Sequence, residues 1–198
     1  YDDIAFISTL KCIRESRNIN GILMSQFILR IFFSFMVIYM PIYLNQHIGF
    51  SWPEIGIIFT IMLLPFVLFE YPLGRLADTK IGEKEILIIG FIILIFSTAF
   101  IPFMNTTSLI PWAILLFITR VGASFAEITT ESYFFKHVDG TDTSTISLFR
   151  ITRPVSYIVG PLIATIGLFF LNIQYIFLIL AVVLLFGLYF SFKIKDTK

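Results

Sequence analysis

Charged residues are scarce in this sequence of 198 residues. Asp, Glu, Lys and Arg make up 14% of it, whereas hydrophobic residues make up 58% and 24 residues are Phe. A soluble domain carries about 25% charged residues, and it needs polar surface to cover its core. The composition therefore excludes a soluble globular protein and indicates an integral membrane protein.

The sequence also has no basic tract, and its formal net charge is +1. A nucleic-acid partner would require a clustered positive surface, so we expect none. A single cysteine, Cys12, excludes an internal disulfide and a CxxC site. Because Cys12 falls in a charged segment without a second cysteine, we interpret it as a passive thiol.

Motifs for catalysis are missing as well. The two histidines, His47 and His137, fall in expected loops on opposite sides of the membrane, so they cannot form a shared metal site. The sequence contains no HExxH, GxSxG or GxxxxGK[ST] pattern. We therefore expect neither an enzyme nor a bound cofactor or metal.

The sequence does contain six long apolar runs. They cover residues 21–43, 53–72, 85–104, 109–136, 145–171 and 173–192. Each is about 20 residues or longer, which is enough for a helix to cross about 30 Å of hydrocarbon. The sequence predicts an all-α integral membrane protein with six transmembrane helices over 21–192. A polar lead-in at 1–20 and a basic tail at 193–198 flank them.

The distribution of Lys and Arg predicts the orientation in the membrane. The expected loops at 45–52 and 105–108 and the turn at Asn172 contain neither residue. The loops on the other side carry Lys11, Arg14, Arg17, Arg75, Lys80, Lys84, Lys136, Arg150 and the lysines of the tail. By the positive-inside rule, both termini are cytoplasmic. We expect a multi-pass protein of the plasma membrane, in contact with the lipid bilayer.

A loose internal symmetry relates the two halves of this arrangement. Arg30 lies about ten residues into the first helix and Arg120 about ten residues into the fourth, and these helices cross in opposite directions. The third and sixth helices are nearly free of charge, so they can face lipid. This pattern predicts two inverted three-helix repeats.

Charged residues inside the runs are the candidates for a functional site, because an arginine at mid-membrane costs about 3 kcal/mol. The spacing of Arg120, Glu127 and Glu131 places them on one face of the fourth helix. Two interpretations stay open, and they are compatible with each other. One is a structural ion-pair network, and the other is a pathway for substrate or protons. The residues concerned are Gln26, Arg30, Arg120, Glu127, Glu131, Arg150 and Arg153.

Small residues recur every four positions in the fifth helix. Ser156, Gly160 and Ala164 form a smooth face, and Pro161 lies beside it. Small residues at this spacing let two helices approach closely in lipid. We interpret this face as a packing surface, with a bending point for gating as the alternative.

The charged stretch from Glu70 to Glu85 separates the second run from the third, and we expect it to be a short aqueous hinge. Within it, Gly74-Arg-Leu-Ala-Asp78, followed by Gly82 and Lys84, resembles motif A of the major facilitator superfamily. That motif has Gly, three residues, Asp, a basic residue, any residue, Gly and then basic residues. Here Thr79 replaces the basic residue, Gly82 comes one residue later, and Glu83 precedes Lys84. In the fourth helix, Arg120-Val-Gly122 is similar to the family's intramembrane arginine motif.

The resemblance covers the whole chain and implies one six-helix half of a secondary transporter that works by alternating access. It implies that Gly74, Arg75, Asp78, Gly82 and Lys84 form a cytoplasmic gate, with Asp78 acting through charge pairs and a helix dipole. The implied partners are a small-molecule substrate, the other six-helix half and a coupling proton or ion. The charged lead-in is similar to the loop that joins two halves, so we expect a fragment carrying the C-terminal half. A six-helix scaffold or assembly subunit without transport activity is the alternative.

Overall fold

A computed structural model describes residues 17–79, 82–138 and 142–195, apart from the side chains of Arg17 and of residues 76–79. Within these residues, six helices are long and apolar enough to cross a membrane. They are α2 (Arg17–Tyr43), α3 (Trp52–Thr79), α4 (Glu83–Phe100), α5 (Leu109–His137), α6 (Thr143–Phe170) and α7 (Ile176–Lys193). Short turns extend three of them: the π-helix η1 (Leu44–Ile48) and the 3-10 helices η2 (Ile101–Phe103) and η3 (Ile173–Tyr175). The prediction of an all-α membrane fold with six spans is confirmed.

The ends of the helices follow the local sequence rather than hydrophobicity alone. Helix α6 begins where Asp142 caps it, since its carboxylate accepts a hydrogen bond from the Thr145 backbone N–H at 3.1 Å. This bond and one from the Thr145 hydroxyl lower the pKa of Asp142. Helix α3 shows the largest departure from expectation. It continues past Pro72 to Thr79, so much of the expected hinge is helical. The residues from Arg75 to Thr79 contain neither Gly nor Pro to end the helix.

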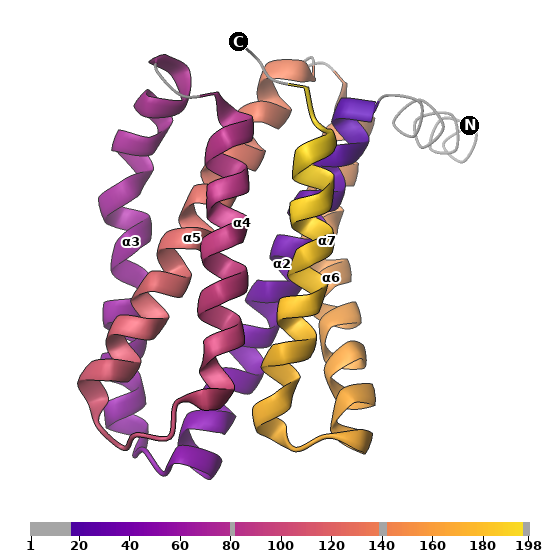
Figure 1. Ribbon diagram of the computed structural model, residues 1–198. Coiled ribbons are helices and arrows are strands. Elements are labelled where there is room, and N and C mark those ends of the chain that lie inside the picture. Colours follow the sequence, from indigo (N-terminus) through magenta and orange to yellow (C-terminus); the bar gives the residue numbers. More distant parts are fainter. Residues whose placement is uncertain (1–16, 80–81, 139–141, 196–198) are drawn as a thin grey trace.

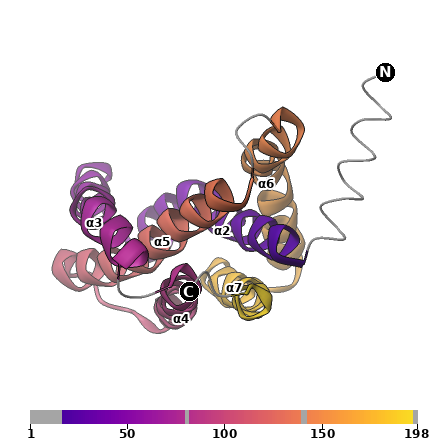
Figure 2. The same cartoon turned by 90° about the horizontal axis from the view of Figure 1, so that it is seen from above.

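The packing of the helices interlocks two three-helix units. Helices α2 and α5 lie at the centre, with α4 and α7 together along one side of them (Figure 2). Helix α3 packs against α5 rather than α2, and α6 packs against α2 rather than α5. Likewise, α4 packs against α5 and α7 against α2. Each unit of three therefore places its second and third helices against the first helix of the other, as two inverted repeats would. Helix α2 begins at the end of the bundle where α7 ends (Figure 1).

Two close crossings repeat this relation in detail. Gly90 of α4 meets Gly122 of α5 so closely that an added Cβ on Gly90 would lie 2.9 Å from the Gly122 carbonyl oxygen. In the other crossing, the Ser25 hydroxyl of α2 lies 3.5 Å from the carbonyl oxygen of Gly187 of α7. Gly122 follows Ser25 by the same number of residues as Gly187 follows Gly90. The two repeats therefore use equivalent positions for equivalent contacts.

The α4–α5 crossing gives a direct prediction about stability. We expect Gly90→Ala to lower the free energy of unfolding by about 1–3 kcal/mol, the usual cost of overpacking. The new methyl group would meet backbone atoms of Gly122 and Ala126, which cannot rotate away. The matched control is Gly56→Ala in α3, where an added Cβ has open space and should stabilise the helix by about 0.5–1 kcal/mol. Thermal unfolding of both variants in detergent measures the difference. Equal melting temperatures would contradict the close backbone contact between Gly90 and Gly122.

The outer helices are not buried equally by the rest of the chain. Helices α3 and α6 are the least buried of the six spans, whereas α4 and α7 are covered to a larger extent. On α3, for example, Val67 and Tyr71 are each 78% exposed. Their low charge lets the third and sixth helices, α4 and α7, face lipid, but the largest exposed faces within this chain belong to the second and fifth helices, α3 and α6. Because α4 and α7 pack against α5, α2 and each other, they close one side of the bundle.

Candidate functional site

An ion pair joins the two central helices in the interior of their spans. Arg30 Nη1 of α2 lies 2.7 Å from Glu127 Oε1 of α5, and the two side chains are 14% and 23% exposed. Arg30 Nη2 also donates to Glu131 Oε1 at 3.3 Å. The carboxylates lie four residues apart on α5, so one face of that helix presents both to a single guanidinium. Each partner of the pair supplies the counter-charge that the other needs inside a membrane.

Gln26 completes the polar contacts of Arg30. When the amide oxygen of Gln26 points toward Arg30, it accepts hydrogen bonds from Arg30 Nη2 and Nε at 2.9 and 3.0 Å. Its amide nitrogen then lies 2.8 Å from the Thr130 hydroxyl, which itself donates to the Glu127 carbonyl oxygen. Gln26 is 1% exposed and Thr130 is fully buried. The guanidinium is therefore held from both helices, and its position is fixed by the α2–α5 contact.

The ion pair joins two residues that correspond to each other in the two repeats. Arg30 follows Ser25 by five residues, and Glu127 follows Gly122 by five residues, so the paired residues occupy equivalent positions. The counterpart of Arg30 in the second repeat is therefore Glu127, and the expected correspondence of Arg30 with Arg120 was wrong. Five residues of α-helix turn by about 500°, which places both charges about 140° round from the faces that contact α7 and α4. The pair is thus turned away from the contacts with α4 and α7, and α3 and α6 lie beyond the opposite side of α2 and α5 (Figure 2).

Arg120 is the second arginine of the central helices, and its surroundings differ. It is 4% exposed, and its guanidinium lies over the rings of Phe32 and Phe33 at 5.8 and 5.3 Å from their centroids. Phe33 also lies under Arg30, at 5.5 Å. Within the described part of the chain, Arg120 forms neither a hydrogen bond nor an ion pair, and its Nε has no acceptor.

The other predicted charges of this region lie outside the cluster. Arg150 and Arg153 of α6 are exposed, and among the described side chains neither pairs with Glu127 or Glu131. Glu70 of α3 lies close enough to Glu131 to interact with it electrostatically. The sequence pattern did not predict that these two residues are neighbours. Of the ion-pair network considered from the sequence, the structure brings together Arg30, Glu127 and Glu131.

The small-residue face of α6 is a packing surface in the structure. Ser156, Gly160 and Ala164 are buried, and α6 packs against α2. An added Cβ on Gly160 would lie 2.6 Å from Ser34 Oγ of α2. Pro161 lies inside the helix, and its carbonyl oxygen accepts from the Tyr39 hydroxyl of α2 at 3.4 Å. This face therefore holds α6 against α2.

The motif-like segment lies at the end of the bundle where α3 stops and α4 starts. Gly74 and Arg75 belong to the last turns of α3, and Gly82 is the residue before α4. Lys84 is in the first turn of α4 and half-buried. The side chain of Asp78 lies outside those that the structure describes. The predicted gate residues therefore lie at the two helix ends joined by the α3–α4 connection.

Glu83, in the same segment, is a buried residue that sequence reasoning missed. It is 1% exposed at the first position of α4, and it forms an ion pair with Lys136 at the end of α5. The Ser132 hydroxyl, one turn earlier on α5, donates to the same carboxylate at 3.4 Å. The available signal was an acidic residue at a position where the resembled motif has a basic one.

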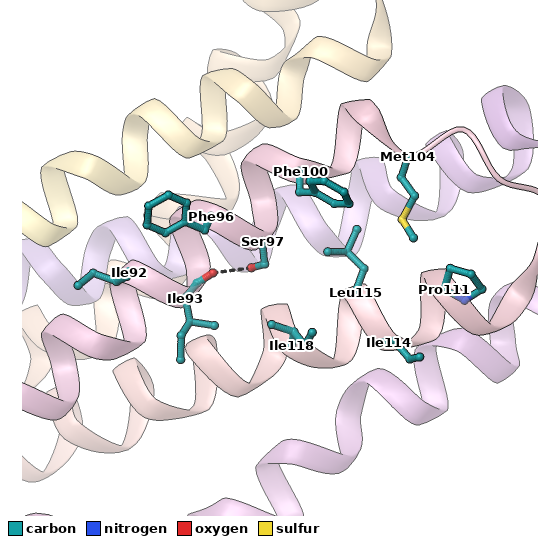
Figure 3. A pocket seen from close by; sticks show the side chains of 10 residues that line it. All are labelled: Ile92, Ile93, Phe96, Ser97, Phe100, Met104, Pro111, Ile114, Leu115 and Ile118. Carbon is teal, nitrogen blue, oxygen red and sulfur yellow. Dashed lines mark hydrogen bonds between the residues drawn. The ribbon is translucent and has the colours of Figure 1, made fainter.

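An open apolar groove with a volume of about 840 Å³ lies along α4 and α5, with Phe96, Phe100 and Ile114 among its lining (Figure 3). The Ser97 hydroxyl, which also lines it, donates to the Ile93 carbonyl oxygen at 2.6 Å and is therefore already engaged. This groove is separate from the charged cluster on the other side of α5. Among the described residues, no three His, Cys, Asp or Glu side chains gather as metal ligands do.

Comparison with known proteins adds one finding to this geometry. Residues 22–198 match the family model of the Major Facilitator Superfamily, so the match begins within the first span and reaches past the last of the six found in the described residues. A comparison with curated proteins gave no match.

Proposed function

The chain belongs to the Major Facilitator Superfamily, and from that membership we propose that it is one half of a solute transporter that works by alternating access. Members of this family are transporters rather than enzymes and handle small molecules. The chain is a multi-pass membrane protein with six spans. In the proposed arrangement a second six-helix unit completes the transporter.

The ion pair between Arg30 and Glu127 carries this proposal. It lies inside the spans at equivalent positions of the two repeats, and both side chains keep some exposure. A pair with only a structural role gains nothing from exposure, whereas a transport pathway requires polar groups that water and solute can reach. The proposed pathway therefore runs along the side of α2 and α5 that α3 and α6 flank.

The exposed faces of α3 and α6 support the presence of a second unit. These two helices flank the charged cluster and bury little of their surface in this chain. A second six-helix unit set against them would enclose the cluster and shield it from lipid. We propose that the cluster becomes the centre of the transporter in this way.

The end of the bundle that carries the α3–α4 connection is the proposed cytoplasmic end. Arg75, Lys84 and Lys136 lie there, and so does the end of α7 with Lys193. The positive-inside rule then places both termini in the cytoplasm, and we propose the plasma membrane as the location. Gly74, Arg75, Asp78, Gly82 and Lys84 form the proposed gate at this end, which closes the pathway when the cytoplasmic side is shut.

Alternating access can be tested without knowing the solute. In full-length protein with Cys12 replaced by Ser, a Val37→Cys variant places a thiol two turns beyond Arg30 on the same side of α2, where the valine is 51% exposed. The control is Val182→Cys on α7, similarly exposed at 56%. A membrane-impermeant maleimide should label the first variant from either face of sealed vesicles and the second from neither. Labelling of the Val37→Cys variant from one face only, or from none, would instead favour a static scaffold.

A further inference from the structure

Arg120 is a cation that forms no ion pair and no hydrogen bond in the described part of the chain. Only 4% of its surface is exposed, its guanidinium lies over the rings of Phe32 and Phe33, and its Nε has no acceptor. An arginine at the centre of a transmembrane helix costs about 3 kcal/mol on insertion scales, and these residues almost always face a partner or a wet cavity. A buried donor without an acceptor adds its own desolvation cost. Both costs call for an acceptor that the described residues do not supply.

The carboxylates of the cluster are engaged elsewhere. Glu127 exerts its charge on Arg120 but lies 2.7 Å from Arg30, with which it forms the ion pair. Glu131 lies about three turns beyond Arg120 on α5 and also contacts Arg30. Tyr157 of α6 is the other polar group within electrostatic reach of Arg120. The unmatched charge at this depth is therefore positive, and it lies where α2, α5 and α6 meet.

We propose that Arg120 binds an oxyanion group, a carboxylate or a phosphate, of the transported solute. A guanidinium offers its donors in a rigid planar fork, which matches the two oxygens of such a group. The rings of Phe32 and Phe33 hold the guanidinium in place by cation–π contacts, so its orientation is set before the anion arrives. This inference rests on the proposed transport function and assigns a solute class to the same pathway.

The proposal predicts that anions stabilise the full-length protein through Arg120. The probes are acetate, benzoate, succinate and inorganic phosphate, with potassium chloride at matched ionic strength as the reference and benzamide as the uncharged counterpart of benzoate. At ten times its dissociation constant, a bound anion should raise the melting temperature of the two-unit protein by about 2 °C. At least one probe should do so saturably, and benzamide should not.

Three variants assign this effect to the residue. Arg120→Gln should abolish the shift, and Arg120→Lys should weaken the apparent affinity about tenfold, because an ammonium lacks the fork. The Lys variant keeps the charge and serves where the Gln variant does not fold. Lys195→Gln removes an equal charge from an exposed side chain and should respond to anions as the parent does.

Two results would overturn the proposal. One is that no probe shifts the parent, or that Arg120→Gln and Arg120→Lys retain the full shift. The other is that anions have no effect while Arg120→Gln and Glu127→Gln lower the melting temperature equally and the double variant lowers it no further. That result would make Glu127 the partner of Arg120 in a second conformation. Thiol labelling of the Val37→Cys variant reports alternating access independently, so failure of the anion site is distinguishable from failure of the transport function.

Discussion

Glu127→Leu is expected to lower the free energy of unfolding by about 3 kcal/mol, near the lower end of the cost of breaking a buried ion pair. The substitution removes the carboxylate that lies 2.7 Å from Arg30 and leaves the guanidinium inside the membrane. The loss stays at the lower end because Glu131 and Gln26 remain within reach of Arg30. Unfolding of purified protein in detergent, followed by Trp fluorescence, measures the effect.

The double variant Arg30→Met/Glu127→Leu separates the ion pair from the shape of the side chains. Replacing both charges by apolar residues removes the desolvation cost together with the attraction, so stability should return close to that of the parent. The same double variant should show no transport, because the proposed pathway has lost both charges. As a control, Glu85→Gln on the exposed start of α4 should change stability by less than about 0.5 kcal/mol. A Glu127→Leu variant as stable as this control would mean that the pair does not hold α2 against α5.

The sequence was sufficient to predict the spans, because hydrophobic length is the dominant signal in a membrane. The range 109–136 predicted for the fourth helix differs from the observed Leu109–His137 by one residue. The predicted end of the second helix at Pro72 was wrong, since α3 continues to Thr79. A proline removes one hydrogen bond but is tolerated inside membrane helices, and the polar residues that follow it are still able to form helix.

The site could be predicted only in part. An arginine inside an apolar run must have a partner, so Arg30 and the glutamates of the fourth helix were identified as candidates. Which of them pair depends on how α2 and α5 are rotated against each other. The sequence also placed Arg150 and Arg153 in the candidate ion-pair network, yet both lie exposed on α6. The rotation is set by the Gly90–Gly122 and Ser25–Gly187 crossings, whose close contacts are visible only in three dimensions.

Lys136→Met is expected to lower the free energy of unfolding by about 1–3 kcal/mol at the proposed cytoplasmic end, less than a fully buried ion pair would cost because the Lys136 side chain is 43% exposed. Its ammonium neutralises Glu83, a carboxylate that is 1% exposed and joins the start of α4 to the end of α5. Removing the ammonium takes a positive partner away from a carboxylate that helix packing shields from water. The N-terminus of α4 stabilises the carboxylate by up to about 2 kcal/mol in a buried setting, which compensates for the lost ammonium only in part. Unfolding in detergent again gives the measurement.

Exchanging the two charges provides the sharper test of this pair. Lys136→Glu alone should be more destabilising than Lys136→Met, because it sets two carboxylates against each other. The double variant Glu83→Lys/Lys136→Glu should recover most of the loss. Recovery should be incomplete by about 0.3–1 kcal/mol, because a lysine at the first position of α4 opposes the helix dipole. A double variant no more stable than Lys136→Glu would show that the charges act with other groups rather than with each other.

The same pair accounts for a departure from the motif that the segment resembles. Where the motif has a basic residue after its second glycine, this chain has Glu83 after Gly82, and the opposite charge comes from Lys136 on α5. An acidic residue also suits the first turn of a helix better than a basic one. If this pair holds the α3–α4 connection in place for the proposed gate, Lys136→Met should slow thiol labelling of the Val37→Cys variant from one face of the vesicle more than from the other. Equal rates of labelling from both faces would restrict Glu83 and Lys136 to a role in stability.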